Sequence, residues 1–194
     1  CNTWFYMVGG ESGGDNIASM AHRFGFGAKT GIPLNAEEDG FIPTDAILRE
    51  KYSHAFTGGY VAHASIGQGY VLATPIQVAQ MMAGVGNGYS VPKPRLVLQV
   101  QDLNNNITES FDPEERNALN LDLNNLGLVR QGMIDVVNAS AGTAKRARND
   151  YVTMAGKTGT GQWVQNGEDL LISWFAGFAP AEDPRFAFAA ICEG

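Results

Sequence analysis

The sequence predicts an α+β domain in which helices pack on an antiparallel β-sheet. Residues before about position 142 show helical periodicity and helix-boundary signals, whereas residues 153–192 form three consecutive extended segments joined by short turns. Short turns between strands produce antiparallel neighbours. The chain has 194 residues, 44% of them hydrophobic, which suits one globular domain or most of one.

Two helices are predicted at the N-terminal end. Residues 2–8 are apolar and aromatic and are expected to form a buried helix that Gly9 and Gly10 end or interrupt. A second helix begins near Asp15, because apolar residues recur on one helical face at Ile17, Met20, Ala21 and Phe24. Asp15 is expected to cap its start and Gly25 its end.

A turn-rich segment separates these helices from the clearest helix start in the chain. Residues 26–43 are expected to be irregular, residues 44–50 to form a short helical piece, and residues 52–69 to form a glycine-rich loop. Thr74, Pro75 and Gln77 then combine a threonine N-cap, proline at the first helical position and glutamine at the third. This pattern predicts a capping box at the start of a helix that ends near residues 86–88.

The second half of the chain changes from helical to extended patterning. Residues 95–101 are expected to form a strand that pairs with residues 107–111, and residues 112–115 a capped helical turn. A long amphipathic helix ends by Gly142; its apolar face is Leu126, Val129, Met133, Val136 and Val137. Three strands follow, at residues 153–163, 170–179 and 185–192.

Composition excludes several classes of function. The net charge of −7 and the pI of about 4.9 argue against nucleic acid as a partner and give no reason to expect binding to anionic lipid. No apolar run approaches the roughly 18 residues needed to span a bilayer. The histidines and the two cysteines, Cys1 and Cys192, show no metal-ligand spacing, so no metal or cofactor is expected.

The stretch from Ala155 to Trp163 is the strongest candidate for a site. It holds three glycines, two threonines and one lysine, with no acid. An edge strand of this kind can accept an extended peptide as a further strand, with Gly159 allowing close approach and Lys157 attracting a carboxylate. Thr158 and Thr160 supply hydroxyl donors, and an N–H near Thr160 could form half of an oxyanion hole. The alternative is an ordinary edge strand whose solvated lysine guards against aggregation.

Two further segments carry residue types that could act in catalysis. Asn2 is an ordinary helix N-cap unless a serine precedes Cys1, in which case it completes a Ser-x-Asn motif. The only Ser-x-x-Lys in the chain runs from Ser90 to Lys93. Because Pro92 and Pro94 bracket that lysine, the segment is expected to be extended and not to place both side chains on one helical face, as a nucleophile would require.

Three groups of motifs, in this order, resemble the transpeptidase domain of class B, elongation-type penicillin-binding proteins: Ser65–Gly69 with Thr74–Gln77, Gly132–Met133 through Gly142–Ala144, and Lys157–Thr160 with Gln162 and Trp163. The resemblance covers nearly the whole chain. It implies the fold of penicillin-binding proteins and serine β-lactamases, and a D,D-transpeptidase that cross-links peptidoglycan stem peptides through an acyl-serine. It also implies acylation by β-lactams, which mimic D-Ala-D-Ala.

The resemblance assigns roles to six residues. Lys157 matches the strand lysine that supports proton transfer and the anionic substrate, and Asn2 matches the asparagine that orients the acylated substrate. Thr158 and Thr160 would hold the substrate carboxylate, with the Thr160 amide in the oxyanion hole. Gly159 and Gln162 are expected among the substrate-binding residues of the same strand.

The departures from the family pattern lead us to interpret residues 1–194 as the C-terminal part of one truncated transpeptidase domain. The nucleophile segment, the first sheet strands and the C-terminal helix of the family are expected to lie outside the chain, which alone is expected to be inactive. The family implies elongation-machinery partners and a location at the periplasmic face of the inner membrane, through an N-terminal anchor outside the chain. The alternatives are a β-lactam-sensing receptor domain, a class D β-lactamase-like hydrolase and a non-catalytic paralogue of the same fold.

Overall fold

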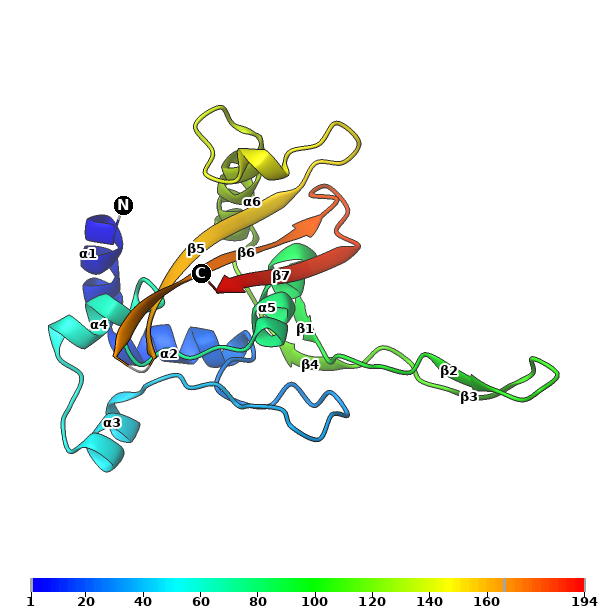
Figure 1. Cartoon of the computed structure of the whole chain (residues 1–194), viewed down its shortest axis with the longest axis horizontal. Helices are drawn as coiled ribbons and strands as arrows, with labels where there is room; N and C mark the ends of the chain where they lie inside the picture. Colours follow the sequence, from blue (N-terminus) through cyan, green and yellow to red (C-terminus); the bar gives the residue numbers. More distant parts are fainter. Residues whose placement is uncertain (1, 166, 194) are drawn as a thin grey trace.

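The computed structural model describes residues 2–165 and 167–193 (Figure 1). The first half is helical, and the chain ends in a three-stranded sheet. The elements before the sheet are α1 (Asn2–Ser12), α2 (Gly14–Arg23), α3 (Asp45–Tyr52), α4 (Gly58–Ala64), α5 (Pro75–Asn87), β1 (Ser90–Pro92), β2 (Gln99–Gln101), β3 (Ile107–Ser110), β4 (Glu115–Ala118), α6 (Leu123–Asn138) and the 3₁₀ turn η1 (Lys145–Ala147).

The sheet is an antiparallel meander of β5 (Ala155–Gln165), β6 (Glu168–Ala179) and β7 (Phe186–Glu193), in that spatial order. Within the described residues β5 is therefore an edge strand, paired to β6 with Lys157 opposite Ala176. The α+β class and the three strands predicted from the sequence are confirmed. The predicted turn through Asn166 lies partly outside the described residues.

The core lies between this sheet and two helices that cover the same face, α5 and α6 (Figure 1). Phe178 on the central strand β6 is 1% exposed. It belongs to a cluster that takes Met82 and Val85 from α5 and Leu126 and Met133 from α6. The α5 start is as predicted: the Thr74 hydroxyl accepts from the Gln77 N–H, and the Gln77 side chain accepts from the Thr74 N–H.

Two glycines face each other where β5 pairs with β6 near its start. Gly156 is the Cα partner of Gly177. A Cβ added to Gly177 would lie 2.1 Å from the Ala155 carbonyl oxygen. The absence of side chains at this glycine pair therefore allows the backbone of β5, which carries Lys157, to pack closely against the backbone of β6.

Three elements differ from prediction. Helix α1 continues through Gly9 and Gly10 and is largely exposed, because it packs on α4 mainly through the buried Gly9 while its aromatic side chains face outwards. Residues 58–64, predicted as loop, form α4, whose start is capped by the Thr57 hydroxyl. Residues 112–115 do not form the predicted helical turn: residues 112–114 have no regular structure, and Glu115 begins β4, which pairs with β1.

The caps of α2 also differ in part. Asp15 does not cap this helix: its carboxylate accepts the N–H of Asp45 and so connects α2 to the start of α3. Gly25, with φ of 90°, follows the last turn as predicted. No helix in the described part of the chain is both long and apolar enough to cross a bilayer.

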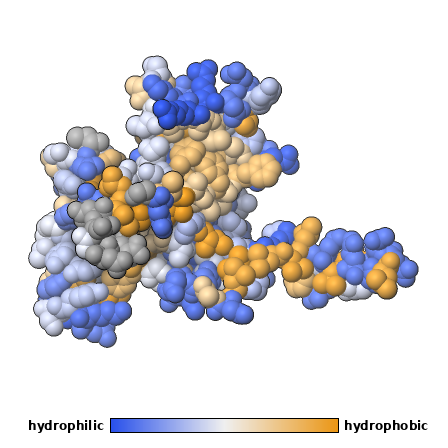
Figure 2. All heavy atoms as spheres, viewed as in Figure 1, coloured by the Kyte–Doolittle hydropathy of each residue, from blue (hydrophilic) through white to orange (hydrophobic). Residues whose placement is uncertain are grey.

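A two-stranded ribbon, β2 paired with β3, projects from the body of the molecule (Figure 1). Apolar side chains run along it (Figure 2), and the exposed ones are Leu96, Val97, Leu98, Val100, Leu103 and Ile107. Helix α1 adds further exposed apolar residues, including Trp4 and Met7. Such surfaces promote association in water.

We expect the 194-residue chain, produced alone, to aggregate on heating and not to melt cooperatively, because these apolar surfaces are open to solvent. Circular dichroism and light scattering during a temperature ramp would measure this. Leu98→Lys with Leu103→Lys should slow aggregation if the ribbon contributes. A reversible, concentration-independent melt at high temperature would contradict the expectation.

Candidate functional site

Asn2 and Lys157, from opposite ends of the chain, line one cavity of about 390 Å³. Its other walls are Ile66 and Gln68 from the turn after α4, and Thr158, Gly159 and Thr160 from β5. The two predicted catalytic residues and three of the four predicted substrate-binding residues thus meet at one place. Gln162 is exposed further along β5 and does not line the cavity.

The electrostatic character of this cavity is opposite to that of the whole chain. Among the lining residues that the structure describes, Lys157 is the single ionisable one, and the others carry amide, hydroxyl or apolar groups. The chain as a whole carries −7. A cation without a neighbouring carboxylate attracts anions, so the cavity suits a carboxylate-bearing ligand.

Strand β5 turns two backbone carbonyls away from its neighbour β6. The Lys157 ammonium donates to the carbonyl oxygen of Thr158, and the Gln68 Nε2 donates to that of Thr160 at 2.9 Å. An extended residue points its C=O and its N–H to the same side of the strand. The N–H groups of Thr158 and Thr160 therefore also face away from β6, on the side where an added strand or an oxyanion could bind.

Gln68 is held by a tight turn. Its own N–H and that of Ile66 both donate to the carbonyl of His63, at 2.9 and 3.2 Å. Gly67 and Gly69 on either side have φ of 71° and 73°, a conformation that glycine adopts without strain. The Gly-Gln-Gly sequence therefore presents the Gln68 amide to β5 from a firmly bonded backbone.

Two residues at the site were not among the predicted site residues. Both lie within family motifs, Gln68 in Ser65–Gly69 and Thr143 in Gly142–Ala144, but no role in the site was predicted for either from the sequence. The Thr143 hydroxyl lies 2.8 Å from that of Thr158, so it fixes the orientation of the Thr158 hydroxyl, which is predicted to hold the substrate carboxylate. The sequence offers no signal for either contact, because each joins segments far apart in the chain.

Ser90 is unsuited to nucleophilic attack, in agreement with the sequence analysis. It lies in β1 opposite Ala118 and is 3% exposed. Lys93 forms an ion pair of 2.7 Å with Glu114. The Ser-x-x-Lys spacing here belongs to an extended, structural segment.

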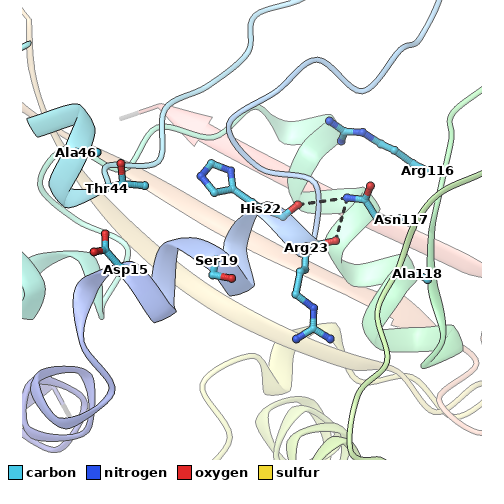
Figure 3. Close-up of a pocket in the computed structure, with 9 residues that line it drawn as sticks. All are labelled: Asp15, Ser19, His22, Arg23, Thr44, Ala46, Arg116, Asn117 and Ala118. Carbon is cyan, nitrogen blue, oxygen red and sulfur yellow. Dashed lines mark hydrogen bonds between the residues drawn. The ribbon is translucent and has the colours of Figure 1, made fainter. Parts of the chain in front are cut away.

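A larger hollow of about 890 Å³ lies between α2, the start of α3 and β4 (Figure 3). Several of its polar groups are used by the fold: Asn117 donates to the carbonyls of His22 and Arg23, and Arg23 donates to that of Asn120. Arg116 donates to the carbonyls of Gly25, Ala28 and Lys29. We therefore regard it as a structural junction.

In the described residues no group of three or more His, Cys, Asp or Glu side chains is arranged to hold a metal ion. The cavity walls likewise carry hydroxyl, amide and ammonium groups, which favour an anion over a cation.

Comparison with known proteins identifies the family. The penicillin-binding protein transpeptidase domain matches residues 1–194. The chain is 30% identical to the peptidoglycan D,D-transpeptidase MrdA of Haemophilus influenzae, over 99% of this chain and 31% of that protein. It is 32% identical to MrdA of Salmonella typhimurium, over 99% of this chain and 33% of that protein.

Solved structures of penicillin-binding proteins support the same family assignment. PBP2 of Pseudomonas aeruginosa, in complex with WCK 5153, matches with a TM-score of 0.84 and 33% identity, over 99% of this chain and 42% of that one. PBP2 of Helicobacter pylori in complex with MreC matches with a TM-score of 0.80 and 26% identity, over 98% of this chain and 34% of that one. The chain therefore belongs to the penicillin-binding protein transpeptidase family, and its relatives are of the class B type that the motifs indicated. It spans about a third of the length of the curated relatives it matches.

Proposed function

We propose that residues 1–194 are the C-terminal part of the transpeptidase domain of a peptidoglycan D,D-transpeptidase. The observation that carries this proposal is the cavity that joins Asn2 to the Lys157 edge of β5. Lys157 supplies a cation for a terminal carboxylate, and the N–H groups of Thr158 and Thr160 face outwards, where a developing oxyanion could bind. Asn2 supplies a side-chain amide that can orient the peptide.

In this proposal a serine outside the chain attacks the penultimate D-Ala carbonyl of a stem peptide. The serine oxygen–carbon bond forms, the amide carbon–nitrogen bond breaks, and the leaving D-Ala nitrogen takes up a proton. The amine of a second stem peptide then displaces the serine and completes the cross-link. Thr158 and Thr160 hold the carboxylate and Lys157 supports its charge and the proton transfer, while the Thr160 N–H receives the oxyanion.

The wider setting is proposed from the relatives. A PBP2 relative is solved with MreC and others carry the name peptidoglycan D,D-transpeptidase. We infer that this protein works with cell-wall elongation partners at the periplasmic face of the inner membrane. No metal or cofactor takes part in the proposed reaction.

A fluorescent penicillin tests the proposal. The longer protein that contains this chain is expected to be labelled covalently and to release ring-opened drug slowly, and a peptide ending in D-Ala-D-Ala should compete and be cross-linked. Rapid release would indicate a hydrolase of the same fold. Labelling without any peptide reaction would indicate a β-lactam receptor.

The 194-residue chain alone is expected to remain unlabelled by the same penicillin, because its one Ser-x-x-Lys serine, Ser90, is buried in β1. Gel fluorescence with peptide mapping would measure this, with the longer protein as the positive control. Labelling of the chain at Ser90 would overturn both the assignment of the nucleophile and the site described here.

A further inference from the structure

Gln68 makes a contact that neither the family motifs nor the proposed roles include. Its side-chain amide donates to the Thr160 carbonyl across a separation of 92 residues in sequence. Gln68 and Thr160 both line the cavity. The contact joins the turn after α4 to the edge strand at the residue whose N–H is proposed to bind the oxyanion.

Within the part of the chain that the structure describes, Thr160 lies on an edge strand, so its backbone conformation is restrained by a neighbouring strand on one side only. Thr160 is exposed, and its carbonyl is turned away from β6, so the ladder does not hold it on that side. An edge residue that twists moves its N–H as well as its C=O. Because an oxyanion hole works through donors already in place before the charge develops, such freedom lowers the rate.

We propose, on the basis of the proposed function, that Gln68 is a positioning residue for acylation: it holds Thr160 in the extended conformation that turns its N–H into the cavity. The rigid turn at residues 67–69 makes this possible, since a side chain can fix a strand only if its own backbone is fixed. A carbonyl oxygen has two lone pairs, so Thr160 can still accept a hydrogen bond from an incoming peptide.

The test uses the longer protein and measures acylation by a fluorescent penicillin, separating the acylation rate constant from the preceding dissociation constant. Gln68→Met keeps the length of the side chain and removes its donor. We expect the acylation rate constant to fall about tenfold, less than the loss of an oxyanion donor itself, with the dissociation constant and melting temperature little changed. Gln68→Glu, which places an acceptor against the carbonyl, should lose at least as much.

Gln131→Met is the matched control, because Gln131 is exposed on α6 and also makes one amide hydrogen bond, to Asp135 at 3.0 Å. It should acylate at the wild-type rate. Hydrogen exchange of residues 155–162 supplies a second measurement, and faster exchange is expected in Gln68→Met only.

The outcomes separate the two proposals. If the unaltered protein is not acylated, the proposed function fails. If it is acylated and Gln68→Met behaves like Gln131→Met in both rate and exchange, Gln68 is not a positioning residue. A fall in melting temperature that accounts for the lost activity would likewise assign Gln68 a merely structural role.

Discussion

Replacing Lys157 by alanine is expected to slow acylation of the longer protein by about 10²- to 10³-fold while the fold is retained. Of the described residues that line the cavity, Lys157 is the one cation, so its removal takes away their only positive charge that can meet a carboxylate or assist proton transfer. The side chain is exposed, and in the described part of the chain it forms no ion pair, so little stability depends on it. Stopped-flow acylation and a thermal melt measure the two effects.

Two further variants show whether the effect is specific to Lys157 and whether it depends on charge or on proton transfer. Lys145→Ala removes an exposed lysine from η1 that does not line the cavity, and this variant should acylate normally. Lys157→Arg keeps the positive charge but cannot give up a proton at neutral pH. If arginine restores the rate, Lys157 acts by charge alone; if it does not, proton transfer is involved. An unchanged rate in Lys157→Ala would reduce Lys157 to a surface lysine.

In the longer protein that contains this chain, Phe178→Ala is expected to destabilise the domain by about 3–5 kcal/mol, the range for deleting a buried aromatic ring. Phe178 lies on the central strand and is 1% exposed, between α5 and α6. Its loss leaves a cavity where both helices meet the sheet. In a domain of this size the melting temperature falls by about 2–4 °C for each kcal/mol.

Tyr151→Ala is the matched control for Phe178→Ala. Tyr151 is 99% exposed, and its contact to Asn149 is through the backbone, which alanine keeps. It should melt within about 2 °C of the unaltered protein, since surface substitutions usually change stability by less than about 0.5 kcal/mol. Equal melting temperatures for the two variants would mean that the packing around Phe178 is not as described.

Part of the site could be predicted because its chemistry is local in sequence. Lys157, Thr158, Gly159 and Thr160 are consecutive, so one edge strand was enough to place them together. Asn2 was linked to them only by a family resemblance, and the structure does bring it to the same cavity. Gln68 and Thr143 could not be predicted, because nothing local to residues 68 or 143 indicates a partner on β5.

The sequence by itself determined the capped start of α5, the long helix α6, the meander of three strands and the family, because capping, periodicity and turn length are properties of neighbouring residues. Tertiary structure alone decided that Glu115–Ala118 forms a strand and that α1 continues through Gly9 and Gly10 with its aromatic side chains exposed. It also decided that the Gln68 side chain donates a hydrogen bond to the Thr160 carbonyl. Each of these depends on a partner distant in the chain. Local preferences at such positions amount to no more than about 1 kcal/mol, which a single long-range pairing or packing contact can override.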